Sequence, residues 1–348
     1  MSQKVIPINP TGTASAGMPA GRRRRGLPKG RQIDATALSQ VRALLGDAPR
    51  RRDLLIEHLH RINDRYGMLA SRHLAALAAE MGLAQAEVYE VATFYHHFDV
   101  VKDDDATAPG AIPRLTVRVC ESLSCDMAGA GDLLARLPGL LGDQIRVVPA
   151  PCVGRCAQAP VAVVGQKPIE HATSEAIHTA VMARQTTDTP PTSLTRSQYE
   201  QDGGYRLLRD CAAGVHSLES VLVTLEDAGL RGLGGAGFAA GRKWRAVGAQ
   251  PGPRLMAVNI DEGEPGTFKD RVYLEQDPHR FLEGMLIGAW AVQASEIYIY
   301  LRDEYHGCRA LLQAEIASLQ SCPPVPGMPA IHLRRGAGAY ICGEESAM

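Results

Sequence analysis

The chain has 348 residues, with 37 Lys and Arg against 38 Asp and Glu, so its formal net charge is −1. Its length predicts two or three domains, its 45% hydrophobic content argues against a wholly disordered chain, and its balanced charge argues against a dedicated nucleic-acid binder. No apolar run approaches the ~18–20 residues of a membrane span and no signal-peptide core follows Met1, so we expect a cytoplasmic protein without a membrane span.

Two segments of different character open the chain. Residues 1–33 are rich in Gly, Pro, Ser and Thr and carry Arg22–Arg25, which predicts a disordered basic tail. From 34 to 100, apolar residues recur every three or four positions, which predicts a small helical bundle. His96 and His97 lie near its end, and for both the sequence favours a structural role over metal binding.

A compact α/β unit is expected over 114–184, after a linker that has no apolar face. Its predicted strands and helices cover 115–119, 131–137, 145–148, 161–164 and 174–183. Residues 185–198 contain Pro190-Pro191 and many Thr, which predicts a second linker.

A further α/β region is expected over 199–348. A predicted helix at 217–228 precedes a glycine-rich loop, and a strand at 255–259, a helix at 280–292 and a strand at 297–301 follow. Because a strand–helix–strand unit favours a parallel sheet, we assign the chain to the α/β class.

Four of the eight cysteines form two pairs, and each pair follows a predicted strand. The pairs are Cys120-x4-Cys125 and Cys152-x3-Cys156. Two loops at the same end of a small sheet can bring such pairs together as one site with four thiolates. The arrangement suits a [2Fe–2S] cluster with two thiolates per iron, while a structural zinc ion or four unrelated buried thiols remain alternatives.

The segments around these cysteines are specific enough to compare with a known family. They are Val91–Phe98 (VATFYHHF), Val119-Cys120, and Ala150–Cys156 (APCVGRC). Over roughly residues 35–185 the chain resembles the 24-kDa-type subunit of respiratory complex I, which has a helical bundle and a thioredoxin-like [2Fe–2S] domain. The resemblance implies that a [2Fe–2S] cluster is held by Cys120, Cys125, Cys152 and Cys156.

A glycine-rich loop, Gly232–Phe238 (GLGGAGF), follows the predicted helix at 217–228. A dinucleotide-binding fingerprint must follow a strand, so the ordinary Rossmann interpretation is weak. Backbone N–H groups of glycines can nevertheless approach a phosphate closely, and Arg242 and Lys243 add positive charge. A tight structural turn is an equal alternative.

An acidic loop, Asn259–Gly266 (NIDEGEPG), follows the predicted strand at 255–259. Ligands of open α/β sheets bind beyond the carboxyl ends of the strands. The carboxylates of this loop are acceptors for ribose hydroxyls, a flavin ring N–H or a carboxamide, with a metal site as the alternative. A second glycine loop, Gly336–Glu345, supplies further glycines, a tyrosine and two acids.

These three segments together resemble the 51-kDa-type flavoprotein subunit of complex I, which binds FMN and NADH. The implied contacts to the phosphate and ribityl chain of FMN come from Gly232, Gly234, Gly235 and Lys243. The implied contacts to the flavin come from Asn259, Asp261, Glu262, Tyr340, Gly343 and Glu344. Phe238 is implied to stack on the nucleotide, and Glu264 and Glu345 are implied to orient NADH. Because FMN itself carries the hydride, no side chain is implied as a catalytic acid or base.

The order of the two modules resembles the β (diaphorase) subunit of NAD-dependent, molybdenum- or tungsten-containing formate dehydrogenase, and also the diaphorase subunit of NAD-reducing hydrogenase. Segments 51–60, 230–235 and 298–305 favour the formate enzyme. The resemblance implies a subunit that passes electrons between iron–sulfur clusters, FMN and NAD+/NADH. The implied partner is a large molybdenum- or tungsten-pterin iron–sulfur subunit, or else hydrogenase subunits.

The flavoprotein region is expected to be incomplete. The families that it resembles continue past the position of Met348 and carry a [4Fe–4S] site there. We therefore expect this chain to lack that cluster and to be inactive alone.

Overall fold

The computed structural model describes residues 30–103, 115–232 and 236–344. Residues 1–29 of the predicted basic tail at 1–33, most of the first linker, and Gly234, Gly235 and Glu345 lie outside the described residues. From Ile33 onward the described residues belong to one contact unit, which contains three hydrophobic cores.

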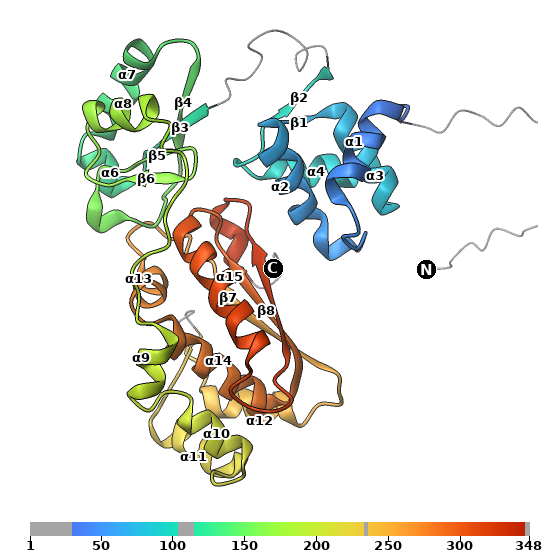
Figure 1. Ribbon diagram of the computed structural model, residues 1–348, viewed down its shortest axis with the longest axis vertical. Coiled ribbons are helices and arrows are strands. Elements are labelled where there is room, and N and C mark those ends of the chain that lie inside the picture. The colour runs from blue at the N-terminus through green and yellow to red at the C-terminus, as the bar shows by residue number, and fades with distance from the viewer. Residues whose placement is uncertain (1–29, 104–114, 233–235, 345–348) are drawn as a thin grey trace, which may run out of the picture. The chain divides into compact units, whose positions relative to one another are not determined.

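Helices α1 to α4 surround the first core, as the apolar spacing predicts (Figure 1). Asp34 caps α1, because its Oδ1 accepts a hydrogen bond from the Ala37 N–H at 2.6 Å. Gly67 and Gly82 end α2 and α3 in the left-handed conformation, with φ angles of 73° and 67°. The elements are α1 (Ala35–Leu45), η1 (Arg52–Leu54), α2 (Leu55–Tyr66), β1 (Leu69–Ala70), α3 (Ser71–Met81), α4 (Gln85–Phe94) and β2 (Val100–Val101).

The second core lies beside a sheet with strand order β4-β3-β5-β6. Helices α7 and α8 contact each other and pack on this sheet. Strand β3 pairs in parallel with β4 and antiparallel with β5. Because β3 and β4 are parallel, the cysteine loops that follow them meet at one edge of the sheet. The elements confirm the predicted α/β unit, and they are β3 (Leu115–Cys120), α6 (Leu123–Met127), α7 (Ala130–Leu141), β4 (Ile145–Ala150), η2 (Cys156–Gln158), β5 (Ala162–Val164), β6 (Lys167–Ile169) and α8 (Ser174–Met182).

The third core contains a sheet of order β7-β8-β9, in which both pairings are parallel. This confirms the predicted parallel sheet. Ile297, Ile299 and Leu301 of β8 are buried and alternate with less buried neighbours, so one face of the sheet packs on the core beneath α14 and α15 (Figure 1). The elements are α9 (Arg196–Gln201), α10 (Arg206–Ala212), α11 (Leu218–Asp227), α12 (Ala240–Gly248), β7 (Arg254–Ile260), α13 (Lys269–Gln276), α14 (Pro278–Val292), β8 (Ala294–Leu301), α15 (His306–Ser321), β9 (Ala330–Arg335) and η3 (Tyr340–Gly343).

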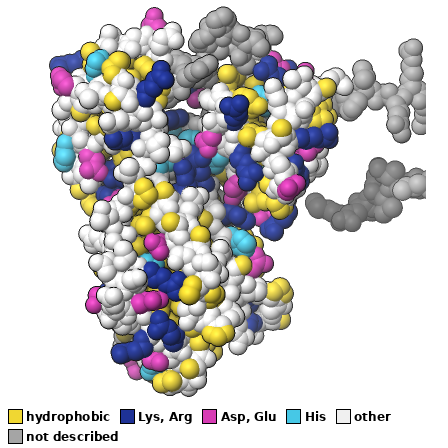
Figure 2. Space-filling model, viewed as in Figure 1, with side chains coloured by type: hydrophobic (Ala, Val, Ile, Leu, Met, Phe, Trp, Pro, Cys, Tyr) yellow, Lys and Arg dark blue, Asp and Glu magenta, His cyan; other side chains and the backbone are white. Residues whose placement is uncertain are grey.

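The charged side chains fit the balanced composition of the chain. On the face shown in Figure 2, basic and acidic side chains are interspersed, in keeping with a formal net charge of −1. Among the described residues, none of the helices combines the length and the apolar character that crossing a bilayer requires.

Candidate functional site

The four paired cysteines converge at the edge where β3 and β4 end. Cys120 is the last residue of β3, Cys125 lies in α6, and Cys152 and Cys156 follow β4. The Cys152 and Cys156 sulfurs are 3.4 Å apart, and the thiols of Cys120 and Cys152 are hydrogen-bonded to each other. Cys120, Cys125 and Cys152 are buried.

This donor set fits a [2Fe–2S] cluster. With bonds of ~2.3 Å, two thiolates on one tetrahedral metal ion lie about 3.7 Å apart. The separation of 3.4 Å between the Cys152 and Cys156 sulfurs is close to that value. The spacing of the second pair therefore suits one iron, and the assignment of all four cysteines to the cluster stays a prediction.

The environment of three of the four thiols, those of Cys125, Cys152 and Cys156, favours the protonated form. The hydrogen bond to Cys152 lowers the pKa of Cys120, and the same bond raises the pKa of Cys152. Burial raises the pKa of Cys125 and of Cys156. Because iron binds thiolates, assembly of a cluster must displace protons from these groups.

Gly154 forms the tight turn between the two cysteines of the second pair. Its φ angle is 71°, and its N–H donates to Cys152 Sγ at 3.4 Å. A Cβ atom at this position would lie 2.5 Å from the ring of Tyr305. The backbone conformation and the close approach of Tyr305 both require glycine here.

The loops after β7, β8 and β9 meet at the carboxyl edge of the parallel sheet, where ligands of such sheets bind. The Arg302 N–H donates to Ile260 O at 3.1 Å, and the Gly336 N–H donates to Leu301 O at 2.8 Å. The Asn259 side-chain amide donates to Gly343 O, in the second glycine loop after β9, at 2.7 Å. These bonds bring the predicted acidic loop and the second glycine loop together.

Asp261 offers an acceptor that has no donor. Its Oδ2 is buried and has no hydrogen-bond partner among the described residues, and burial raises the pKa of this carboxyl to about 6. A Cβ atom at Gly343 would lie 2.7 Å from the Asp261 carbonyl oxygen, so glycine is needed beside it. An unpartnered acceptor beside a close-approach glycine fits a ligand that donates a hydrogen bond, such as a flavin ring N–H. Asn259, Asp261 and Gly343 are thus the residues that would hold FMN here.

The predicted glutamates occupy different environments. Glu262 is 5% exposed, and its carboxylate accepts hydrogen bonds from the Asp270 N–H at 3.0 Å and the Tyr305 hydroxyl at 3.0 Å. Glu262 therefore supports the loop from inside, and its contact with flavin stays a prediction. Glu264 and Glu344 are exposed, and Glu264 accepts a hydrogen bond from the Tyr340 hydroxyl at 3.1 Å.

The first glycine-rich loop joins α11 to α12, so it follows a helix, as predicted. The Gly232 N–H donates to Phe238 O at 2.9 Å and closes the described part of the loop. The Phe238 side chain is 58% exposed, and Lys243 is exposed on α12. Their roles toward FMN stay predictions, as do those of Gly234 and Gly235.

Arg302 joins the cysteine loop to the acidic loop, and the sequence did not predict it. Its guanidinium donates to the carbonyl oxygens of Cys152 and Glu262. Next to it, the Gly266 N–H donates to Cys156 Sγ at 3.2 Å. The position of Arg302 directly after the predicted strand at 297–301 is the signal that could have identified it.

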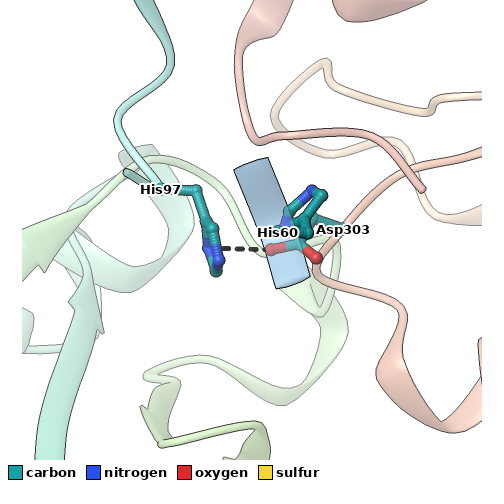
Figure 3. Close-up of side chains that lie close together, drawn as sticks. All are labelled: His60, His97 and Asp303. Atoms are coloured by element: carbon teal, nitrogen blue, oxygen red, sulfur yellow. Dashed lines mark ion pairs between the residues drawn. The ribbon is translucent and has the colours of Figure 1, made fainter. Parts of the chain in front are cut away.

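A buried ionic cluster joins the helical bundle to the loop after β8 (Figure 3). Asp303 pairs with His97 Nδ1 at 2.8 Å and with Arg335 Nε at 2.5 Å, while His60 Nε2 is 2.6 Å from Gly336 O. Ligand atoms of His60, His97 and Asp303 lie within 4.8 Å of one another, a spacing that a metal ion can bridge. Because Arg335 already binds Asp303 and its charge would repel a cation, we interpret the cluster as an ion network. This fits the structural role predicted for His97.

Two families match the two predicted modules, in the predicted order. The thioredoxin-like [2Fe-2S] ferredoxin family matches residues 41–185, and the Nuo51 FMN-binding domain matches residues 225–348. The chain therefore contains a thioredoxin-like [2Fe–2S] domain followed by an FMN-binding domain of the complex I type. These matches confirm the predicted fold class and the predicted [2Fe–2S] and FMN cofactors.

Several proteins similar to this chain are, by their names, subunits of NADH- or NAD-linked oxidoreductases. An NADH-quinone oxidoreductase subunit of Rhizobium meliloti is 43% identical over 160 residues, which are 44% of this chain and 38% of that protein. The NAD-reducing hydrogenase HoxS subunit alpha of Cupriavidus necator is 28% identical over 343 residues, which are 85% of this chain and 55% of that subunit. A crystal structure of NAD+-reducing [NiFe]-hydrogenase in the air-oxidized state is similar to this chain, with a TM-score of 0.67 and 27% sequence identity. The match covers 84% of this chain and 53% of the hydrogenase chain. The chain thus spans between a third and just over half of the length of these relatives.

Proposed function

We propose that this chain is the electron-transfer (diaphorase) part of an NAD-dependent oxidoreductase and passes electrons between NAD(H), FMN and the [2Fe–2S] cluster. The observation that carries the proposal is the direct contact between the two loops that would hold the cofactors. The Gly266 N–H of the acidic loop donates to Cys156 Sγ at 3.2 Å, and Arg302 bonds both Cys152 O and Glu262 O. Electron transfer requires that the two cofactors lie close together, and the contact between the two loops supports the proposal for that reason.

The side chains bind and orient the cofactors, and no proton-transfer residue is needed. When bound, FMN exchanges a hydride with a nicotinamide and single electrons with iron–sulfur clusters. In the proposal, Asp261 accepts a hydrogen bond from the flavin, and Asn259 holds the second glycine loop in place. Glu264 lies at the exposed mouth of the site beside Tyr340, where it would contact NADH.

The Cys125→Ser variant tests the cofactor assignment. The protein is reconstituted with iron, sulfide and FMN, and its visible absorption and its iron, sulfur and flavin contents are measured. We expect near two iron and two sulfide per wild-type chain, and loss of the [2Fe–2S] spectrum in the variant with FMN binding retained. Cys322→Ser, at an exposed cysteine outside the pairs, is the matched control. An unchanged spectrum in Cys125→Ser, or zinc in place of iron, would overturn the assignment.

We further propose formate as the terminal substrate of the whole enzyme, with a large molybdenum- or tungsten-pterin iron–sulfur subunit as partner. Segments 51–60, 230–235 and 298–305 support this choice through their resemblance to the formate enzyme. Oxidation of formate to CO2 releases two electrons and one proton, which are what NAD+ takes up to become NADH.

A diaphorase role in an NAD-reducing hydrogenase is the second candidate. The similarity to the HoxS subunit alpha over 85% of this chain favours it. Isolation of the native complex separates the two candidates. A copurifying metallopterin subunit with formate-dependent reduction of NAD+ supports the first, whereas nickel–iron subunits with H2-dependent reduction support the second and overturn the first.

A further inference from the structure

The side chain of Arg302 is fixed at the centre of the candidate site. Arg302 follows β8, the middle strand of the parallel sheet, and it is 4% exposed. One guanidinium nitrogen donates to Cys152 O and another donates to Glu262 O. The Nε atom donates to a carboxylate oxygen of Glu304 at 3.0 Å. All three guanidinium nitrogens therefore have hydrogen-bond acceptors within the protein.

Arg302 acts electrostatically on both sides of the contact between the cysteine loop and the acidic loop, and Glu304 acts on the acidic loop. The hydrogen bond with Cys120 raises the pKa of Cys152, and the charge of Arg302 opposes that rise. Burial raises the pKa of Asp261, while the charge of Arg302 lowers it and the charge of Glu304 raises it. The charge of Arg302 thus reaches a predicted cluster ligand and a predicted flavin contact, and the charge of Glu304 reaches the predicted flavin contact.

The pair also lines a small cavity between the two loops. This cavity has a volume of about 80 Å³, and Cys152, Gly263, Arg302, Glu304 and Tyr340 are among its lining residues. In so confined a space, charges interact at a low effective dielectric constant and are little screened by salt.

Other buried arginines near the cysteines do not share this arrangement. Arg271 is 3% exposed and donates to Gly154 O at 3.0 Å and to the Gln158 side chain at 3.4 Å, but among the described residues it does not bond the acidic loop. Its charge is paired with Glu275 at 2.7 Å, on its own helix α13. Arg302 is distinguished by bonding a predicted cluster-ligand residue and the acidic loop at once.

We propose that Arg302 and Glu304 are positioning residues that hold the cluster loop against the flavin loop and set the reduction potential of the [2Fe–2S] cluster with opposite signs. Reduction adds one electron, and hence one negative charge, to the cluster. The Arg302 cation stabilises that added charge and raises the potential, whereas the Glu304 anion opposes it and lowers the potential. The proposal rests on the proposed function, because it assumes that the paired cysteines hold the cluster.

The test is a redox titration of the cluster, followed by the EPR signal of its reduced state, in the wild type and in Arg302→Met, Arg302→Lys and Glu304→Gln. We expect Arg302→Met to shift the one-electron equilibrium about tenfold toward the oxidised cluster, which lowers the reduction potential by about 59 mV. We expect Glu304→Gln, which keeps an acceptor for Arg302 Nε, to shift it in the other direction. Arg302→Lys should lie near the wild type, because it keeps the charge. Arg334→Met, in β9, is the control that should leave the potential unchanged.

The opposite signs separate electrostatics from simple disruption. Unchanged potentials, or shifts of Arg302→Met and Glu304→Gln in the same direction, would overturn the proposal. If Arg302→Met does not retain a cluster, Glu304→Gln decides alone, and a potential that fails to rise overturns the proposal. A wild-type protein without a [2Fe–2S] signal would instead overturn the proposed function.

Discussion

The buried carboxylate of Asp303 should contribute strongly to the stability of the folded chain. Asp303 is 4% exposed and pairs with His97 at 2.8 Å, Arg335 at 2.5 Å and Arg309 at 3.5 Å. Asp303→Asn preserves the shape of the side chain but leaves Arg335 and Arg309 without its charge. Removing one partner of a buried ion pair costs about 3–5 kcal/mol. We expect the free energy of unfolding to fall by about 3 kcal/mol, measured by urea unfolding followed by circular dichroism.

A second acidic partner of Arg335, Asp64, provides a matched control. Asp64 pairs with Arg335 at 2.7 Å, but its side chain is 46% exposed. Exposed ion pairs contribute about 0.2–1 kcal/mol. Asp64→Asn should therefore lower the free energy of unfolding by less than about 1 kcal/mol.

The acid range gives a second measurement of the same effect. Burial by itself would raise the pKa of Asp303, but His97 and Arg335 outweigh it and hold the pKa well below its ordinary value. A depressed folded pKa contributes stability that is present above the unfolded pKa of ~3.9 and is lost as the pH falls toward the folded pKa. The wild type should therefore lose more stability than Asp303→Asn below about pH 4. Equal losses in the two proteins, or equal effects of Asp303→Asn and Asp64→Asn at neutral pH, would refute this reasoning.

Three further predictions concern the cofactor sites. Gly154→Ala places a Cβ 2.5 Å from Tyr305 at a φ of 71°, so it should lower the free energy of unfolding by roughly 2 kcal/mol or more and reduce the cluster content. The control is Gly214→Ala, which has a φ of 77° and no atom within 4 Å of the new Cβ, and should show the backbone cost alone. Equal effects of the two variants would contradict the clash with Tyr305. Because burial raises the pKa of Asp261 to about 6, the stability tied to its protonated form is lost as the pH rises through 6. The free energy of unfolding of Asp261→Asn should thus exceed that of the wild type without FMN by about 1–2 kcal/mol at pH 8 but not at pH 4, which a series of Tm measurements against pH would show. The variant should also bind FMN more weakly, as measured by flavin fluorescence. A variant that is no more stable than the wild type at pH 8 would disprove a raised pKa of Asp261. Because burial raises the pKa of the Cys125 and Cys156 thiols, both predicted cluster ligands, reconstitution with iron and sulfide should become more complete from pH 6.5 to pH 8.5. A cluster yield that does not depend on pH would argue against protonated thiols.

Two elements of the last module were not predicted from the sequence. Strand β9 (Ala330–Arg335) is short, and only Ile331 and Leu333 alternate with polar residues in it. Helix α15 (His306–Ser321) is different, because Leu312, Ile316 and Leu319 have helical spacing and the signal was present. The tertiary position of both elements matters, since β9 makes β8 the central strand and so places Arg302 between two loops.

The sequence by itself determined the two modules, the parallel strands of the second one and the pairing of the cysteines. These features depend on short-range spacing, which a single segment carries. Only the tertiary structure decided that the Gly266 N–H contacts Cys156 across 110 positions and that Arg302 bonds Cys152 across 150. It also decided the raised pKa of Asp261 and the lowered pKa of Asp303, because burial and nearby charges act through space and have no periodicity along the chain.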